Sequence, residues 1–360
     1  FKDHLSEGGK SLSINDKNAL SLQYLKEYPD VEEIKISSAT KYSTLISLQH
    51  LAFHKKLNQL ILFDANDAMY KELQYLKHLK KIRIVTGTDT NDAFDLSYLS
   101  KLEELEEVDI RSFNRSINIP LLANLKKLKK LELASDCLHE FDLGKCPRLE
   151  TLATAIDVTT ILPDQGLSSF RNIKNLRLGQ IYTLEEKKLN FEYLLPLKNL
   201  ESLTIDEIFL DYGINFASLG KLKSLKHLIL DAEYYMERPQ VDYSFVQSLL
   251  NLESISIDQF LEFPWDQLEG LPKLKQIRIE GSFYSEEDVE LLEESVSTFL
   301  TLENLEKIII ASDYNEYPFN PFVTFYDLIK KGVTVSYEEE YGDKTQVYNN
   351  FKLAEYSENI

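Results

Sequence analysis

Apolar residues recur along the chain with a period that changes from three to two. The stretch at residues 122–136 reads LANLKKLKKLELASD, with leucines at Leu122, Leu125, Leu128, Leu131 and Leu133. A period of three is typical of a tight helical turn, and a period of two is typical of a β-strand. We therefore predict a turn that leads into a short strand. One such unit has no core of its own, so it is expected to fold only where copies of it stack.

Copies of this strand pair run through the whole chain. From Ile36 to Val335, 299 residues are divided into 12 steps of about 25 residues, which is typical of stacked repeats. The predicted inward pairs are Ile34/Ile36, Leu60/Leu62, Ile82/Ile84, Val108/Ile110, Leu131/Leu133, Leu152/Thr154, Leu176/Leu178, Leu203/Ile205, Leu228/Leu230, Ile255/Ile257, Ile277/Ile279, Ile308/Ile310 and Val333/Val335.

The two ends of the array are predicted to be capped. At the first end, Leu12-Ser13-Ile14 has the strand period, and an apolar run from Ala19 to Leu25 favours a short amphipathic helix. At the far end, Val333–Glu340 and Thr345–Phe351 flank a Gly-Asp turn and predict a hairpin. We expect residues 1–30 to form an N-terminal cap, 31–336 to form about 13 irregular repeats, and 337–360 to form a C-terminal cap hairpin and tail.

These repeats resemble the leucine-rich repeat family. The segments FASLGKLKSLKHLIL (216–230) and FVQSLLNLESISI (245–257) are most similar to the internalin and phosphatase-regulatory classes. The resemblance implies an α/β solenoid, a horseshoe with a concave parallel β-sheet and short helical turns on the convex side. The asparagine that usually follows the strand in this family is replaced, for example by Asp136, Glu233 and Phe260, so an asparagine ladder is not expected at that place.

The composition indicates a soluble protein. Hydrophobic residues make up 43% and charged residues 28% of the chain, and no stretch approaches the roughly 20 apolar residues of a membrane span. Cys137 and Cys146 are interpreted as two free thiols or, alternatively, as one local disulfide; Cys146 replaces an apolar residue, which favours its burial. The chain begins at Phe1, so export stays an alternative to the cytoplasmic location that we expect.

The net charge of −19 comes entirely from the second half. Residues 1–180 carry 25 acidic and 25 basic side chains, whereas residues 181–360 carry 34 acidic and 15 basic ones. An acidic surface repels phosphate groups, so we expect neither nucleic acid nor a membrane as partner. A protein with a basic surface fits better.

A row of four carboxylates is predicted on the concave face of the second half. The residues that directly follow four successive strand pairs are Asp206, Asp231, Asp258 and Glu280. Adjacent strands lie about 4.8 Å apart, so we expect these side chains to stand side by side. A row of like charges suits a basic partner or a cation. The alternative is an ordinary solvated surface in an acidic half.

Aromatic residues and one histidine complete the predicted partner-binding site. Tyr234, Tyr235 and Trp265 follow the same strands and are candidate anchors for a Lys- or Arg-rich surface, although such side chains also seal irregular loops. His227 is expected on the concave side of its strand, near the acidic row.

The sequence favours a binding protein over an enzyme. We find no Gly-x-Ser-x-Gly elbow, no phosphate-binding glycine loop and no His-Glu-x-x-His motif, and we expect no cofactor and no metal. The first hypothesis is a monomeric, non-catalytic protein-protein interaction module that binds a basic partner. The alternatives are an exported surface protein that recognises a glycan or cell-surface ligand, and a regulatory subunit of an enzyme, which the resemblance implies.

Overall fold

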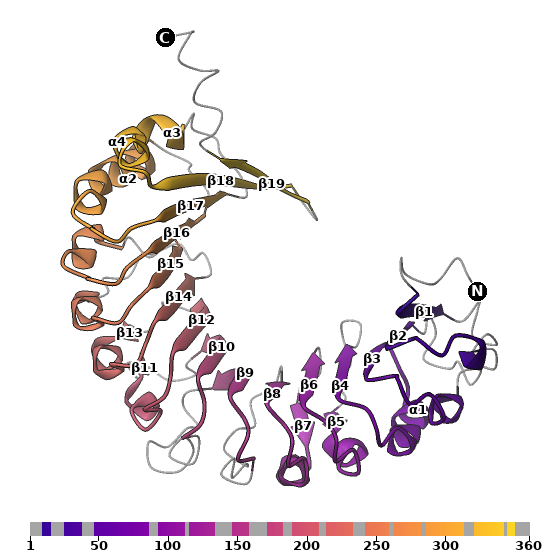
Figure 1. Cartoon of the computed structure of the whole chain (residues 1–360). Helices are drawn as coiled ribbons and strands as arrows, with labels where there is room; N and C mark the ends of the chain where they lie inside the picture. The colour runs from indigo at the N-terminus through magenta and orange to yellow at the C-terminus, as the bar shows by residue number, and fades with distance from the viewer. Residues whose placement is uncertain are drawn as a thin grey trace. The chain divides into compact units, whose positions relative to one another are not determined.

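The chain divides into two compact units, which are described separately. The N-terminal unit comprises Phe1–Ile156 and Thr160–Ile173, and the C-terminal unit comprises Asp157–Thr159 and Lys174–Ile360. The structure, a computed structural model, describes residues 9–15, 25–37, 47–85, 93–111, 115–133, 146–157, 171–182, 189–208, 214–232, 242–258, 263–281, 286–312, 320–341 and 344–349. Figure 1 shows the elements in chain order.

The N-terminal unit is built on a parallel sheet in chain order. Its strands are β1 (Ser11–Asn15), β2 (Glu33–Ser37), β3 (Gln59–Phe63), β4 (Lys81–Val85), β6 (Glu107–Arg111), β8 (Lys130–Leu133) and β9 (Thr151–Asp157). A small second sheet pairs β5 (Ala93–Asp95) with β7 (Arg115–Ile117). The helical elements are η3 (Leu48–Leu51), α1 (Asp67–Glu72), η4 (Leu73–Tyr75), η5 (Leu96–Leu99) and η6 (Ile119–Asn124), where η denotes a 3₁₀ turn.

The C-terminal unit repeats the arrangement. Its main strands are β10 (Asn175–Tyr182), β12 (Ser202–Ile208), β14 (His227–Ala232), β15 (Ser254–Asp258), β16 (Gln276–Glu280), β17 (Lys307–Ser312), β18 (Thr334–Tyr341) and β19 (Lys344–Asn349), and β11 (Leu189–Asn190) pairs with β13 (Ile214–Asn215). Its helical elements are η10 (Glu192–Leu194), η12 (Ala217–Lys221), η13 (Ser244–Ser248), η15 (Trp265–Leu268), α2 (Glu286–Phe299), α3 (Pro321–Thr324) and α4 (Tyr326–Lys330).

The predicted inward pairs form the core of both units. For example, Leu228 and Leu230 of β14 are register partners of Ile255 and Ile257 of β15, and all four side chains are buried. Each buried leucine or isoleucine contributes on the order of 1.5–3 kcal/mol, and no single repeat has enough of them to fold alone. Consecutive 3₁₀ turns contact each other, and they lie on the opposite side of the core from the strands (Figure 1). We call the sheet face that looks away from the turns the open face; it corresponds to the predicted concave face.

Both predicted capping elements are found. Strand β1 pairs with β2 so that Leu12 lies beside Ile34, and β18 forms an antiparallel hairpin with β19. Of the predicted helix between Ala19 and Leu25, only Leu25 lies among the described residues, and its side chain is buried.

Two details of the repeats differ from the prediction. The last inward pair is Val335 and Tyr337, which are the partners of Ile308 and Ile310, so the predicted pair Val333/Val335 was wrong by two residues. A shift of two keeps the same side chains on the core face, and Val333 is buried as well, which explains the error. The repeat between β16 and β17 contains α2, a helix of 14 residues, instead of a short turn.

Candidate functional site

The predicted acidic row lies at the carboxyl ends of neighbouring strands in the C-terminal unit. Asp258 of β15 and Glu280 of β16 are direct register partners. Asp231 follows Leu230, which pairs with Ile257, the residue before Asp258, so Asp231 and Asp258 take equivalent positions on adjacent strands. Both side chains are half-buried. Carboxylates on three successive strands therefore do occupy one row of the open face.

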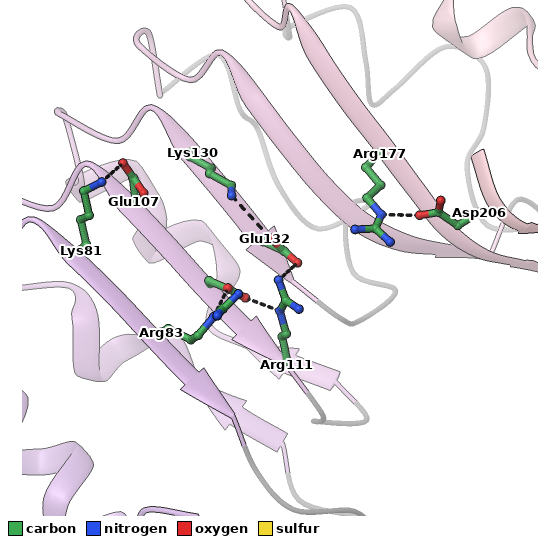
Figure 2. A network of polar contacts seen from close by, with 9 residues as sticks. Lys81, Arg83, Glu107, Arg111, Lys130, Glu132, Arg177 and Asp206 are labelled. Carbon is green, nitrogen blue, oxygen red and sulfur yellow. Dashed lines mark hydrogen bonds and ion pairs between the residues drawn. The ribbon is translucent and has the colours of Figure 1, made fainter. Parts of the chain in front are cut away.

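Asp206, the first residue of the predicted row, stands where the register between β12 and β14 becomes irregular. Ile205 pairs with Leu230 and Ile208 pairs with Ala232, so two residues of β12 lie opposite one residue of β14. A bulge of this kind re-aims a side chain. The carboxylate of Asp206 is only 11% exposed and accepts a hydrogen bond from Nε of Arg177 on β10, which Figure 2 shows. The four predicted carboxylates therefore differ in exposure, because Asp206 is mostly buried whereas Asp231 and Asp258 are half-buried.

Glu280, at the other end of the row, is held by an arginine of its own strand. Nε of Arg278 donates to Glu280 at 2.8 Å, and Nη1 of Arg278 donates to Glu338 of β18 at 2.6 Å. The hydroxyl of Ser256 donates to the same Glu280 oxygen at 2.7 Å. Burial alone would lower the pKa of Arg278, but the hydrogen bond to Glu338 and the charges of both carboxylates outweigh it and raise the pKa.

Between these two arginines, strands β14 and β15 contribute no lysine and no arginine to the open face. Its positions on β14 and β15 hold His227, Ile229, Asp231, Ser254, Ser256 and Asp258, and none of them is Lys or Arg. Ile229 is 36% exposed, which places an apolar side chain on the same strand as Asp231. The sequence analysis missed Arg177 and Arg278 because it considered only the residue after each strand pair, whereas the arginines stand inside the pairs.

Of the other predicted site residues that the structure describes, His227 lies on the open face, whereas Trp265 packs among the turns. His227 is exposed at the start of β14, and its Nδ1 lies 2.8 Å from Oγ of Ser254. Trp265 begins η15, where its ring packs edge-to-face against Phe263 and Phe299 at centroid distances of 5.1 and 5.4 Å. The ring of Trp265 thus contributes to the aromatic packing of the turns. Tyr234 and Tyr235 lie outside the described residues.

On the open face of the N-terminal unit, acidic and basic side chains form ion pairs within and between strands. Arg83 and Arg111 both donate to Asp109, at 2.6 and 2.9 Å, and Arg111 also reaches Glu132 at 2.5 Å. Lys81 pairs with Glu107 at 2.7 Å, and Lys130 lies 3.8 Å from Glu132 (Figure 2). Such partly exposed pairs contribute little stability one by one, but they neutralise this face.

Comparisons with known proteins agree on one architecture. No protein-family model matches the chain, and the sequence of no curated protein matches it. The solved structure of an internalin, InlF from Listeria monocytogenes, is 15% identical with a TM-score of 0.51, and the match covers 93% of this chain and 87% of that one. Toll from Drosophila, in its complex with Spätzle, is 11% identical with a TM-score of 0.52, and the match covers 88% of this chain and 48% of Toll.

Both structures share the stacked strand-and-turn repeats described above. This chain has the leucine-rich repeat fold. At these identities the likeness shows the fold alone, and this chain spans about half the length of the Toll chain that it matches.

The leucine-rich repeats of this chain carry an asparagine row at an unexpected place. It lies four residues before the inward pair instead of after it. Nδ2 of Asn251 donates to the carbonyl of Lys223 in the preceding repeat at 2.8 Å, and Nδ2 of Asn304 donates to the carbonyl of Pro272 at 2.7 Å. Nζ of Lys273 in turn donates to Oδ1 of Asn251 at 2.7 Å. Side-chain amides therefore connect neighbouring leucine-rich repeats, at a position other than the one where the family usually carries its asparagine.

A second row, two residues before the inward pair, alternates in charge from one leucine-rich repeat to the next. It reads Lys80, Glu106, Lys129 and Glu150 in the N-terminal unit and Lys174, Glu201, Lys226, Glu253, Lys275 and Glu306 in the C-terminal unit. Within it, Lys226 lies 2.9 Å from Glu201 and Lys275 lies 3.3 Å from Glu253. The alternation is visible in the sequence once the repeats are aligned on their inward pairs.

The described residues hold no cluster of three or more His, Cys, Asp or Glu side chains suited to a metal ion. No helix among them is long and apolar enough to cross a membrane. Cys146 is a free thiol, and it is buried, as its apolar position in the repeat predicted. Its Sγ lies 3.4 Å from the carbonyl oxygen of Leu122. Cys137 lies outside the described residues.

Proposed function

We propose that this protein is a non-catalytic protein-binding module whose C-terminal unit binds a basic segment of a partner. The observation that carries the proposal is the asymmetry of the acidic row. At each end of the row, the carboxylate is paired with an arginine. The open-face positions of β14 and β15, in the middle of the row, hold two carboxylates and an exposed isoleucine but no Lys or Arg. Asp231 and Asp258 therefore stand on the two strands of the row whose own open-face positions carry no lysine or arginine.

Arginine side chains of the chain itself already bind carboxylates on the open faces of the two units. Arg278 bridges two carboxylates that stand on different strands, and Arg111 does the same between Asp109 and Glu132. Charge-assisted hydrogen bonds from arginine to carboxylates are among the strongest polar contacts in proteins. An arginine of a partner, placed between Asp231 and Asp258, would make the same kind of contact and could rest its aliphatic stem on Ile229.

The fold supports a binding role without naming the partner. Toll, which shares the fold, is seen in complex with Spätzle. Leucine-rich repeat scaffolds place variable side chains on a rigid sheet, so the side chains of the open face decide what is bound. Electrostatic complementarity of this kind mainly accelerates association and selects the partner.

The proposal is tested by comparing proteins captured from a native lysate. The wild type is used beside Asp231→Asn/Asp258→Asn, and retained proteins are identified by mass spectrometry. The matched control is Glu293→Gln/Glu294→Gln, which removes the same charge from exposed positions of α2. We expect a partner with a basic segment that the wild type and the control retain and the face variant loses. Equal retention by all three proteins would overturn the proposal.

A further inference from the structure

Two aromatic side chains stand at equivalent, exposed positions of neighbouring repeats in the N-terminal unit. Leu60 and Ile82 are register partners on β3 and β4, and Phe53 and Tyr75 each precede them by seven residues. Phe53 is 88% exposed and Tyr75 is 46% exposed. The turns η3 and η4, which end just before Phe53 and at Tyr75, contact each other. Both rings therefore belong to one surface.

The fold does not require aromatic residues at this position. In the repeats that lead into β2, β6, β8, β12, β14, β15, β16 and β17, it is occupied by Glu27, Lys101, Asn124, Pro196, Lys221, Ser248, Gly270 and Thr301. Most of these are polar or small, and all except Pro196 are exposed. An exposed phenylalanine gains nothing from the core, and large exposed aromatics are typical of contact surfaces. Phe53 and Tyr75 thus distinguish the first repeats from the rest.

Lysines surround the two rings. Lys55 and Lys77 follow the aromatics by two residues in the same repeats, and both are exposed. From the next repeat, Nζ of Lys101 donates to Oε1 of Gln74 at 3.1 Å, which brings a third ammonium group beside Tyr75.

Two nearby carboxylates are already paired, and one of them is Asp30, whose carboxylate lies 2.5 Å from Nζ of Lys56. Glu72 is turned toward the preceding turn, where it accepts a hydrogen bond from the backbone N–H of Leu48 at 2.6 Å. In the flanking repeats, the position of Phe53 is held by the exposed Glu27, and the position of Lys55 and Lys77 is held by the exposed Glu103. The lysines beside the two aromatic rings are therefore bounded by carboxylates in the preceding and the following repeat.

We infer that Phe53, Tyr75, Lys55 and Lys77 form a second docking surface, whose partner is an acidic protein segment with an apolar anchor residue. The rings supply contact area for the anchor, and the lysines supply the complementary charge. A nucleic acid fits less well, because the cations are few, carboxylates bound them on both sides and the whole chain carries a net charge of −19. This surface is independent of the acidic row and opposite to it in charge.

The test is a selection of random twelve-residue peptides displayed on phage. The full-length wild type is the target, and the pool is first depleted on Phe53→Ser/Tyr75→Ser, whose exposed substitutions should leave the melting temperature unchanged. We expect the enriched peptides to combine several Asp or Glu residues with Trp, Phe or Leu. A synthetic copy of one such peptide should bind Lys55→Gln/Lys77→Gln about tenfold or more weakly, whereas Leu250→Ser, which alters an exposed aliphatic residue of the C-terminal unit, should bind it like the wild type.

Three outcomes would overturn the inference. The first is the absence of any peptide that distinguishes the wild type from Phe53→Ser/Tyr75→Ser. The second is enrichment of basic or uncharged peptides. The third is binding of a single-stranded RNA oligonucleotide that is lost in both the aromatic and the lysine variants, because that result would assign the surface to nucleic acid.

Discussion

Arg177 of β10 donates a hydrogen bond to the carboxylate of Asp206 on β12, across neighbouring strands of the C-terminal unit. The two side chains differ in environment, because Arg177 is 60% exposed and Asp206 is 11% exposed. The carboxylate depends on this partner, whereas the guanidinium can also be hydrated. The pair therefore separates Asp206, which serves the fold, from Asp231 and Asp258, to which we assign the binding of a partner.

Removing the arginine should cost more stability than removing the acid. Arg177→Gln leaves a mostly buried carboxylate without its charged donor, and we expect a loss of about 1–3 kcal/mol in the free energy of unfolding. Asp206→Asn removes the charge that needs compensation and should cost clearly less. Urea unfolding followed by circular dichroism measures both variants. Equal losses would contradict the assignment of Asp206 as the dependent partner.

The repeat architecture could be predicted from the sequence because the inward pairs repeat about a dozen times. The strand period, the capping strand and the terminal hairpin follow from local patterns, and the structure confirms them. The error at Val333/Val335 arose because three alternate residues, Val333, Val335 and Tyr337, are all buried, so the pattern has two registers.

The candidate site was less predictable, since it depends on which side chains meet across strands. The irregular register of β12 at Asp206 has no local signature in the sequence. Arg278 bridges Glu280 and Glu338, which are 58 positions apart in the chain and meet only through the sheet. Knowledge of the repeat register, applied to every open-face position, would have found both arginines.

The row of alternating charges should act on stability through salt-sensitive electrostatics. Nζ of Lys226 donates a hydrogen bond to Glu201 at 2.9 Å, and this bond is the main reason that the pKa of Glu201 is lowered and that of Lys226 is raised. Lys226→Glu places like charges beside Glu201 and Glu253, so we expect a lower melting temperature at low salt and recovery in 1 M NaCl. Adding Glu201→Lys should restore part of the loss. A salt-independent effect would show that packing is responsible.

The same pair predicts a pH dependence. A carboxyl group with a lowered pKa in the folded state stabilises the protein above its ordinary titration range, and this contribution is lost as the pH falls through the lowered pKa. The wild type should therefore lose stability below about pH 4.5, the ordinary value for Glu201. Glu201→Gln should lose less over the same interval, which thermal melts between pH 3 and 7 would measure. Identical pH profiles would contradict this contribution.

The asparagine row should connect neighbouring repeats. Asn251 links the carbonyl of Lys223 to the ammonium group of Lys273, so Asn251→Ala removes two hydrogen bonds between repeats. We expect a loss of about 1–2 kcal/mol in the free energy of unfolding. Asn124→Ala, at an exposed position of the N-terminal unit, is a suitable control and should be nearly neutral. Similar losses in both variants would contradict the proposed role of the row.

Cys146 should be unreactive in the folded protein. Burial raises the pKa of its thiol to about 11, so the nucleophilic thiolate is scarce at neutral pH. Because the folded pKa lies above the ordinary value, the thiol contributes stability below about pH 9 that is lost as the pH rises toward 11. Cys146 should react with a chromogenic disulfide at pH 8 only in denaturant. The variant Cys146→Ser should lack the absorbance change that this reaction produces. Rapid reaction of Cys146 in the native protein would contradict its burial.

The most direct test of the binding account is the salt dependence of the affinity at Asp231 and Asp258. The partner captured from lysate is titrated against the wild type, Asp231→Asn/Asp258→Asn and Glu293→Gln/Glu294→Gln at several NaCl concentrations. We predict that the wild type and the helix control bind tightly at low salt and lose affinity steeply with added NaCl, whereas the face variant binds weakly throughout. An affinity that is insensitive to salt, or equal in the wild type and the face variant, would contradict the central claim.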